Sequence, residues 1–266
     1  MNKTPLISII TVSFNACDVI EKTIQSVISQ TYPNIEYIVI DGGSKDGTVE
    51  VIKKYSDRIT YWVSEKDGGI YYGMNKGIER SNGDWLCFMN SGDEFCSNRV
   101  IADIFKMKIA KDTGVIFGDV ILGYPPYGKV LKRHDNLKGE DQPMCLCHQA
   151  SLTKGELLRE LKYDTSFRIF ADINAFHELW KKGVGFQYVP VAMAVFEGFD
   201  GISSAKPWVS FREINRIRGF RWYNSLTWWK QVLIISVKKI MEACMSEEKY
   251  RNKKYQRIAK KFIKLT

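Results

Sequence analysis

Short apolar runs and segments with helical periodicity alternate along the first hundred residues of the chain. Short runs rich in β-branched and aromatic residues predict strands at 6–13, 35–41, 59–64 and 84–90. The segments between them predict helices at 18–28, 47–55 and 70–81. Strand–helix–strand units of this size favour an α/β fold with a parallel sheet and right-handed crossovers. Ligands of such sheets bind beyond the carboxyl ends of the strands.

The second half of the chain is less regular. Its apolar runs predict strands at 114–122, 124–133, 145–153 and 184–196, with a helix at 167–183 that ends in glycine and places His177 on its surface. From Trp208 onward the sequence is helical in character, aromatic and basic. We therefore predict a catalytic domain at 1–205, whose halves divide near residue 95, and a helical appendage at 206–266.

Polar residues follow each of the first four predicted strands. They are Thr11, Ser13 and Asn15, then Asp41 to Ser44, then Glu65 and Asp67, and finally Asn90, Ser91 and Asp93. Strand ends are commonly polar, so each set alone is weak evidence. Because parallel strands end at the same edge of a sheet, we expect all four sets to converge on one ligand site.

The segment Asp41–Thr48, DGGSKDGT, combines glycines with acidic residues. Glycines let a backbone approach a ligand closely, and a helix is predicted to follow directly. Neither GxGxxG nor GxxxxGK[ST] is present, which argues against a dinucleotide-dependent oxidoreductase. The segment is either a ligand loop, whose acid suits a ribose or base edge, or a tight turn with Ser44 or Asp46 as helix cap.

Composition and charge narrow the class of protein. The 266 residues are 45% hydrophobic and 26% charged, as in ordinary globular proteins. The six cysteines form no CxxC pair, which is typical of reduced thiols, and no leader-like segment opens the chain, so we expect no secretion. The formal net charge is +9, with Lys and Arg dense from Lys206 onward, and this favours an anionic partner surface.

Four segments carry a resemblance to glycosyltransferase family 2. They are ISIITVSFNA, QTYPNIEYIVIDGGSKDGT, SEKDGGIYYGMNKGIERSNGDWLCFMNSGDEF and CHQASL, which match the family in order and spacing. The resemblance extends over about 6–204 and is closest to bacterial enzymes of O-antigen, capsule and exopolysaccharide synthesis. It implies the GT-A fold, a Rossmann-like mixed sheet flanked by helices. It also implies an inverting sugar transferase that uses a nucleotide-sugar, usually a UDP-sugar, with Mg²⁺ or Mn²⁺.

The resemblance also implies which residues bind the nucleotide-sugar. Residues near the strand ends would line the nucleotide and contact its base or ribose, and one helix would close over uridine and diphosphate. The residues at the matching positions are Thr11, Val12, Ser13, Asn15, Asp41, Ser44, Asp46, Asp67, Met74, Asn75 and Lys76, with Asn90 and Ser91 as sugar or phosphate contacts.

The tetrapeptide NSGD, Asn90–Asp93, aligns with the acidic metal motif of the family. Asp93 matches its final carboxylate, while Asn90 and Gly92 replace other acids. A divalent cation offsets the charge of the leaving diphosphate, and Mg²⁺ readily keeps several waters. One protein carboxylate then suffices, because diphosphate and water supply the remaining ligands. The alternative is that Asp93 caps a helix predicted at 94–106.

An inverting transferase needs a base for the acceptor hydroxyl, and Asp172 is the candidate. It lies three residues after Ile169 and four before Phe176, at the edge of the apolar stripe of its predicted helix. A carboxylate on the core side is unfavourable unless it is used or paired. The family places its base in a comparable acidic motif. The alternative is a structural Asp near a helix start, where negative charge is favourable.

His148 and Gln149 resemble the HQ pair on the acceptor side of the family, so we expect a donor or acceptor contact. The alternative for His148 is a buried, hydrogen-bonded histidine. Cys145 and Cys147 next to it suggest a metal cluster, but residues two apart in a strand merely share a face. The segment 197–204 offers Glu197 where relatives often carry a histidine.

The appendage alternates tryptophans with Lys and Arg before the apolar run VLIISV. That run is too short to span a bilayer, which takes about 20 apolar residues. Its aromatic and basic flanks, including Trp208, Trp222, Tyr223, Trp228 and Trp229, suit a membrane interface. The alternative is a helix pair packed on the catalytic domain. Nucleic-acid binding would use similar residues, but nothing else supports it.

These observations predict a glycosyltransferase that extends a lipid-linked saccharide in surface polysaccharide synthesis. It would be cytoplasmic and peripheral on the inner face of the cell membrane, held at the anionic surface by its tail, with homodimerisation left open. A protein of a different class, a catalytically silent nucleotide-sugar-binding or scaffold protein of the same pathway, is also compatible with the reduced metal motif.

Overall fold

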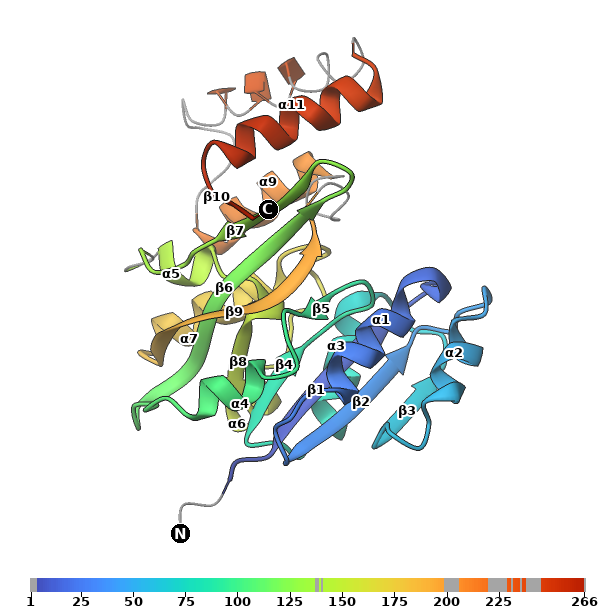
Figure 1. Ribbon diagram of the computed structural model, residues 1–266. Coiled ribbons are helices and arrows are strands. Elements are labelled where there is room, and N and C mark those ends of the chain that lie inside the picture. The colour runs from blue at the N-terminus through green and yellow to red at the C-terminus, as the bar shows by residue number, and fades with distance from the viewer. Residues whose placement is uncertain are drawn as a thin grey trace.

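One mixed β-sheet runs through the molecule (Figure 1). The computed structural model describes residues 4–136, 139, 141–198, 206–219, 229–230, 232–234, 236–237 and 245–265. The strand order is β10-β7-β6-β8-β4-β1-β2-β3, and β9 pairs with both β6 and β5. The mixed sheet predicted from the sequence is therefore observed.

The first half of the chain builds the parallel part of this sheet. Neighbouring strands are parallel between β1 and β2, β2 and β3, and β1 and β4. Strands that follow one another in the chain are joined through a helix, as the alternating sequence pattern predicts, and β4 returns to pair with β1. The strands are β1 (Ile7–Ser13), β2 (Ile35–Asp41), β3 (Tyr61–Ser64) and β4 (Trp85–Phe88).

The second half adds mostly antiparallel strands. β8 pairs antiparallel with β4 and β6, while β6 and β9 are parallel. β7 and β10 extend the far edge with antiparallel pairs. The strands are β5 (Glu94–Phe95), β6 (Thr113–Tyr124), β7 (Gly128–Lys132), β8 (Ser151–Lys154), β9 (Gly185–Glu197) and β10 (Ile263–Leu265).

Helices cover both faces of the sheet (Figure 1). On one face the buried residues come from α1 (Cys17–Ile28), α2 (Thr48–Lys54) and α4 (Val100–Phe105). On the other they come from α3 (Ile70–Arg80), α6 (Gly155–Leu161), α7 (Ala171–Lys181) and α9 (Pro207–Ile217). The remaining helical elements are α5 (Asp141–Met144), η1 (His148–Ala150) and α11 (Glu247–Ala259).

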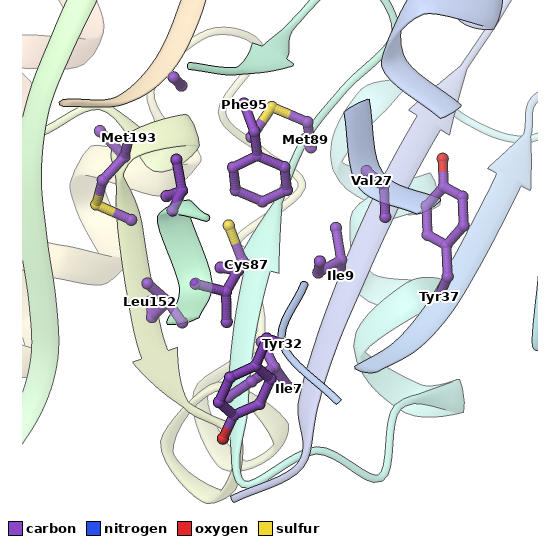
Figure 2. Packing of buried hydrophobic residues seen from close by; sticks show 14 of the residues in the cluster. Ile7, Ile9, Val27, Tyr32, Tyr37, Cys87, Met89, Phe95, Leu152 and Met193 are labelled. Carbon is purple, nitrogen blue, oxygen red and sulfur yellow. The ribbon is translucent and has the colours of Figure 1, made fainter. Parts of the chain in front are cut away.

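The central strands are apolar at nearly every position because both of their faces are buried. In β1, Ile7 and Ile9 pack in one core cluster, whereas Ile10 and Val12 pack in the other. Figure 2 shows the first cluster, in which Ile9 lies among side chains from neighbouring strands. This double burial fixes the strand register and thereby the positions of the strand ends.

Two predicted elements begin later than expected. The predicted strand at 145–153 starts at Ser151, and His148–Ala150 form the 3₁₀ turn η1 instead. The predicted helix at 167–183 begins at Ala171, and His177 is buried rather than on its surface. Within the described residues no group of three His, Cys, Asp or Glu is placed to hold a metal ion, and Cys145 and Cys147 are free thiols.

The C-terminal part of the chain packs against the sheet. Ile217 of α9 is buried in the core cluster that contains α7, and β10 pairs with β7. Tyr255 of α11 contacts the rings of Tyr124 and Tyr127. Phe199–Ser204, Trp222, Tyr223 and Trp228 lie outside the described residues. In the described part of the chain, no helix has the length and apolar character needed to cross a membrane.

Candidate active site

The carboxyl ends of the four parallel strands meet at one edge of the sheet. Ser13 is in register with Asp41, and Asp41 is in register with Ser64. Past the end of β4, the backbone N–H of Ser91 donates to Val12 O at 3.1 Å. The predicted convergence of polar strand ends is therefore observed, and the candidate site is built on this edge.

Asp41 is the centre of a buried hydrogen-bond network and is 0% exposed. Its Oδ1 accepts from the hydroxyls of Ser13 at 2.9 Å and Ser44 at 2.5 Å. Its Oδ2 accepts from Ser64 Oγ at 2.6 Å and from the backbone N–H groups of Gly43 and Ser44. Burial opposes ionisation, but these hydrogen bonds hold the pKa of Asp41 below its usual value. Its carboxylate fixes the loop and is not accessible to a nucleotide.

The rest of the DGGSKDGT segment is also tied internally. Asp46 Oδ1 accepts from the backbone and hydroxyl of Thr48, and its Oδ2 accepts from the backbone N–H of Cys17 at 3.0 Å. Ser44 Oγ accepts from the backbone N–H of Asn15, and Asn15 Oδ1 accepts from Lys45 N–H. The segment is a tight turn, but the prediction that Ser44 or Asp46 caps the helix is wrong, because the N-cap of α2 is Gly47. Asn15 is exposed and stays available to a ligand.

Thr11, Val12 and Met74 do not present side chains to a ligand. Thr11 is 0% exposed, and its hydroxyl donates to Met89 O at 2.7 Å. Val12 and Met74 are buried in the core cluster of α3. The strand and helix faces that carry these three side chains are the core-facing ones. That Thr11 and Val12 line the nucleotide, and that the helix with Met74 closes over it, stays a prediction.

Two further residues of α3 have structural partners. Asn75 Nδ2 donates to Tyr163 O, and Asn75 Oδ1 accepts from Tyr163 N–H, each at 2.8 Å. Lys76 Nζ forms an ion pair with Glu65 at 2.6 Å. Asn75 therefore joins α3 to the segment after α6.

Asp67 is partly exposed and, like Asn15, remains accessible. Its carboxylate lies where two glycines leave room, since a Cβ on Gly42 would approach Oδ1 to 3.3 Å and one on Gly73 would approach Oδ2 to 3.2 Å. Oδ1 accepts from the backbone N–H of Gly69 at 2.8 Å. The half-buried Asp67 carboxylate thus lies beside the backbone of Gly42 and Gly73, which carry no side chains. A carboxylate next to such bare backbone suits recognition of a flat base or a ribose.

The NSGD segment forms a tight turn after β4. Asp93 N–H donates to Asn90 O at 2.9 Å, Gly92 has φ +96°, and its N–H donates to Thr23 Oγ1. The next helix, α4, begins beyond Arg99. The alternative that Asp93 caps a helix is therefore wrong.

Asp93 is half-buried beside η1. Burial raises the pKa of Asp93 to about 6, although the charge of His148 and a hydrogen bond from Gln149 oppose the shift. A carboxylate in this environment lacks a full counter-charge. Such a group gains stability from a bound cation.

His148 joins two side chains from different elements, and Tyr71 joins the same network through Asp172. In the neutral imidazole its Nδ1–H donates to Asp172 Oδ2 at 2.7 Å, and its Nε2 accepts from Asn90 Nδ2 at 3.0 Å. Tyr71 of α3 donates to Asp172 Oδ1 at 3.1 Å and to Ile169 O. The result is a continuous chain of hydrogen bonds from the NSGD turn, through η1, to the first turn of α7.

Asp172 shifts the pKa values of both His148 and Tyr71. Burial opposes protonation of His148, but the hydrogen bond to Asp172 and its charge raise the pKa of the imidazole above its usual value. Burial and the charge of Asp172 raise the pKa of Tyr71, so its phenol stays protonated and donates. Asp172 is itself 7% exposed. The hydrogen bonds from His148 and Tyr71 hold the Asp172 carboxyl group in one orientation at the edge of the site.

The turn offers two oxygen atoms of the kind that Mg²⁺ or Mn²⁺ prefers. Asp93 supplies a carboxylate, and the buried Asn90 Oδ1 has no hydrogen-bond partner among the described residues. Within the described residues Asp93 belongs to no group of three His, Cys, Asp or Glu that could hold a metal ion. The turn therefore fits a divalent cation whose other ligands come from substrate and water, and does not fit an all-protein metal site.

Sequence reasoning missed Tyr71, which orients Asp172. The two tyrosines at 71 and 72 lie in one apolar-rich helix, but Tyr72 is 49% exposed and Tyr71 is buried. Helical periodicity favours Tyr71, since it shares a face with the buried residues Met74 and Ile78. Phe14, 65% exposed beside Asn15, is a second residue at this edge that the sequence analysis did not single out.

Comparison with known proteins agrees with this architecture. Residues 8–171 match the model of the family described as Glycosyl transferase family 2, so the chain belongs to that family. A glycosyltransferase of Mycobacterium tuberculosis is 45% identical over 103 residues, which cover 38% of this chain and 39% of the relative. The putative teichuronic acid biosynthesis glycosyltransferase TuaG of Bacillus subtilis is 36% identical over 102 residues, 37% of this chain and 40% of TuaG.

The similarity to these curated relatives is partial, since it covers about two fifths of their length. Solved structures are similar in fold over a larger part of this chain. S. aureus TarS 1-349 in complex with UDP-GlcNAc gives a TM-score of 0.63 at 14% identity, covering 80% of this chain and 64% of that one. The mannosyltransferase PcManGT from Pyrobaculum calidifontis, in complex with GDP-Man and Mn²⁺, gives a TM-score of 0.63 at 16% identity. The match covers 81% of this chain and 64% of PcManGT. Both support the fold predicted from the sequence.

Proposed function

We propose that this chain is an inverting glycosyltransferase that moves a sugar from a nucleotide-sugar to an acceptor hydroxyl. The observation that carries the proposal is the chain of contacts from Asn90 through His148 to Asp172. It places a held carboxylate next to the turn that carries Asp93, beyond the carboxyl ends of the parallel strands. Family membership supports the reaction class.

In the proposed reaction Asp172 is the general base. The acceptor oxygen attacks the anomeric carbon as its proton passes to the Asp172 carboxylate, and the bond from that carbon to the diphosphate oxygen breaks. The Nδ1–H of His148 and the hydroxyl of Tyr71 hold the carboxylate in position. Attack from the face opposite the leaving diphosphate inverts the anomeric centre.

Asp93, with Asn90 Oδ1, would hold the divalent cation. When bound, the ion offsets the negative charge that grows on the departing diphosphate. Asp67, between Gly42 and Gly73, would receive the nucleoside, and exposed Asn15 would lie along its path. The structures of TarS with UDP-GlcNAc and of PcManGT with GDP-Man and Mn²⁺ make UDP- and GDP-sugars the first donors to examine.

We propose a lipid-linked saccharide as the acceptor and the inner membrane surface as the site of action. Residues 206–266 contain sixteen Lys and Arg but four Glu. Within this segment Trp229 and Leu233 are each 65% exposed, and Ile234 and Val237 lie on the same helical face. An apolar face amid cations suits a surface of anionic lipid. The name of TuaG, which refers to teichuronic acid biosynthesis, favours a surface polysaccharide pathway.

The test is a donor screen with the purified chain. Nucleoside diphosphate release is measured over a panel of UDP- and GDP-sugars with Mn²⁺ or Mg²⁺, with and without saccharide acceptors. The proposal expects one donor to give turnover that EDTA abolishes. Donor binding without turnover across the panel and acceptors would instead favour a catalytically silent nucleotide-sugar-binding protein.

A further inference from the structure

We propose that Glu213, on α9 in the C-terminal part of the chain, is a positioning residue for Asp172. This inference rests on the function proposed above. Glu213 is 8% exposed, and its carboxylate accepts three successive backbone N–H groups. Oε1 accepts from Arg168 at 2.7 Å, and Oε2 accepts from Ile169 and Phe170 at 3.0 Å each.

These three N–H groups precede the first turn of α7. N–H groups at a helix start have no partner within the helix, and burying them unpaired is unfavourable. Successive N–H groups that converge on one point form a concave site for an anion. The Glu213 carboxylate fills that site, so residues 168–170 are held outside the helix. This contact explains why α7 begins at Ala171 and not at 167 as the apolar pattern predicts.

The segment before Asp172 is held from both sides. Tyr71 donates to the carbonyl oxygen of Ile169, opposite the N–H groups that Glu213 binds. One turn along α9 from Glu213, Arg216 pairs with Asp164 at 3.2 Å and lies over the Phe167 ring at 4.2 Å. The helix α9 therefore holds the whole approach to α7, and Asp172 follows Phe170 by two residues.

The sequence gives an independent indication that Glu213 is used. It is the only carboxylate between Lys206 and Met241, in a segment dominated by Lys and Arg. A lone acid in a basic segment would be expected on the surface among cations, yet this one is buried against backbone N–H groups. It also lies outside residues 8–171 that match the family model. The C-terminal segment thereby contributes to the active site and is more than an attached tail.

The role predicts a specific kinetic effect. Removing the carboxylate in Glu213→Ala frees residues 168–170, and a displacement of about 1 Å at a reacting group can lower the rate roughly 100-fold. We expect kcat to fall about 10- to 100-fold. The KM for the nucleotide-sugar should stay near the wild-type value, because Asp67 and Asp93 lie on other elements.

Two further variants sharpen this measurement. In Glu213→Gln one amide oxygen still accepts from Ile169 and Phe170, while the amide NH₂ faces the N–H of Arg168, so an intermediate kcat is expected. Asn215→Ala is the matched control on α9, since the hydrogen bond of the Asn215 side chain among the described residues stays within its own helix, to Phe211 O. Its kcat should equal that of the wild type.

The decisive experiment combines a double-mutant cycle with hydrogen exchange on the full chain. If Glu213 acts through Asp172, Glu213→Ala causes no further loss of kcat in an Asp172→Asn background. An equal loss in both backgrounds, or unchanged kcat in Glu213→Ala and Glu213→Gln, overturns the role. Where Glu213→Ala does not fold, the nearly isosteric Glu213→Gln carries the cycle.

Hydrogen exchange tests the contact without activity. The amides of residues 168–170 should exchange faster in Glu213→Ala than in the wild type or Asn215→Ala. Unchanged exchange overturns the inference even if the donor screen succeeds. A wild-type chain that turns over no donor defeats the proposed function, while faster exchange in Glu213→Ala would still support the contact.

Discussion

Replacing Asp93 by asparagine should inactivate the protein and yet stabilise it in the absence of metal. Burial raises the pKa of Asp93 from 3.8 to about 6, so the ionised form is disfavoured in the folded state. Between pH 3.8 and about pH 6 the folded state therefore binds more protons than the unfolded state. The free energy of unfolding falls as the pH rises through this range. A shift of about 2 pH units corresponds to roughly 3 kcal/mol at most above pH 6. Asparagine is nearly isosteric and removes this penalty.

The assay is thermal unfolding of wild type and Asp93→Asn between pH 4 and 8 in EDTA. At pH 8 we expect the variant to unfold at a higher temperature, by about 2–4 °C for each kcal/mol gained. The difference should shrink towards pH 4, where wild-type Asp93 is protonated. Asp57→Asn, at an exposed aspartate after α2, is the control and should show no such pH-dependent difference. Mn²⁺ with UDP should then raise the Tm of the wild type and not that of Asp93→Asn.

Two results would refute this reasoning. If Asp93→Asn is less stable than the wild type at pH 8 in EDTA, the burial of the carboxylate is not a penalty that a cation relieves. If Mn²⁺ with UDP stabilises both proteins equally, Asp93 is not a ligand of the ion. The two measurements are independent, since the first needs no ligand at all.

Three further predictions concern the base, the turn and the tail. Asp172→Asn should lower kcat by about 10²- to 10⁴-fold with UDP binding retained. Unchanged turnover would remove Asp172 from the mechanism. A larger loss of kcat in His148→Gln than in Asp172→Asn would assign the base to His148. Asn90→Asp should retain Mn²⁺-dependent turnover, because it keeps an oxygen ligand at the same position; loss of activity would show that the amide is needed. Trp229→Glu combined with Leu233→Glu should reduce sedimentation of the protein with anionic vesicles, with neutral phosphatidylcholine vesicles as the control. Undiminished sedimentation would exclude this helical face as the surface that contacts the membrane.

The sequence predicts the sheet well because its central strands are buried on both faces. Runs such as Ile35–Asp41 are short and rich in β-branched residues, which favours a strand over a buried helix, and the observed strand β2 has the same bounds. The convergence of Asp41, Ser64 and the NSGD turn follows from parallel pairing alone. Local pattern and topology thus locate the edge at which the site lies.

The roles of single side chains at that edge depend on contacts that no local pattern records. Met74 and Asn75 lie on a helix whose residues match the family, but their side chains face the core and the Tyr163 backbone. The pairing of His148 with Asp172 joins residues 24 apart, across a 3₁₀ turn where a strand is predicted. Glu213 reaches its partners from 43 to 45 residues away. Such long-range contacts decide which polar residues face a ligand and which support the fold.

The measurement that tests the central claim most directly is nucleoside diphosphate release in the presence of acceptor. Wild type, Asp93→Asn and Asp172→Asn are compared with the best donor of the screen, in Mn²⁺ and in EDTA. The account predicts turnover for the wild type in Mn²⁺ only, and a loss of at least about 100-fold in each variant. Turnover in EDTA, or full activity in either variant, would contradict it.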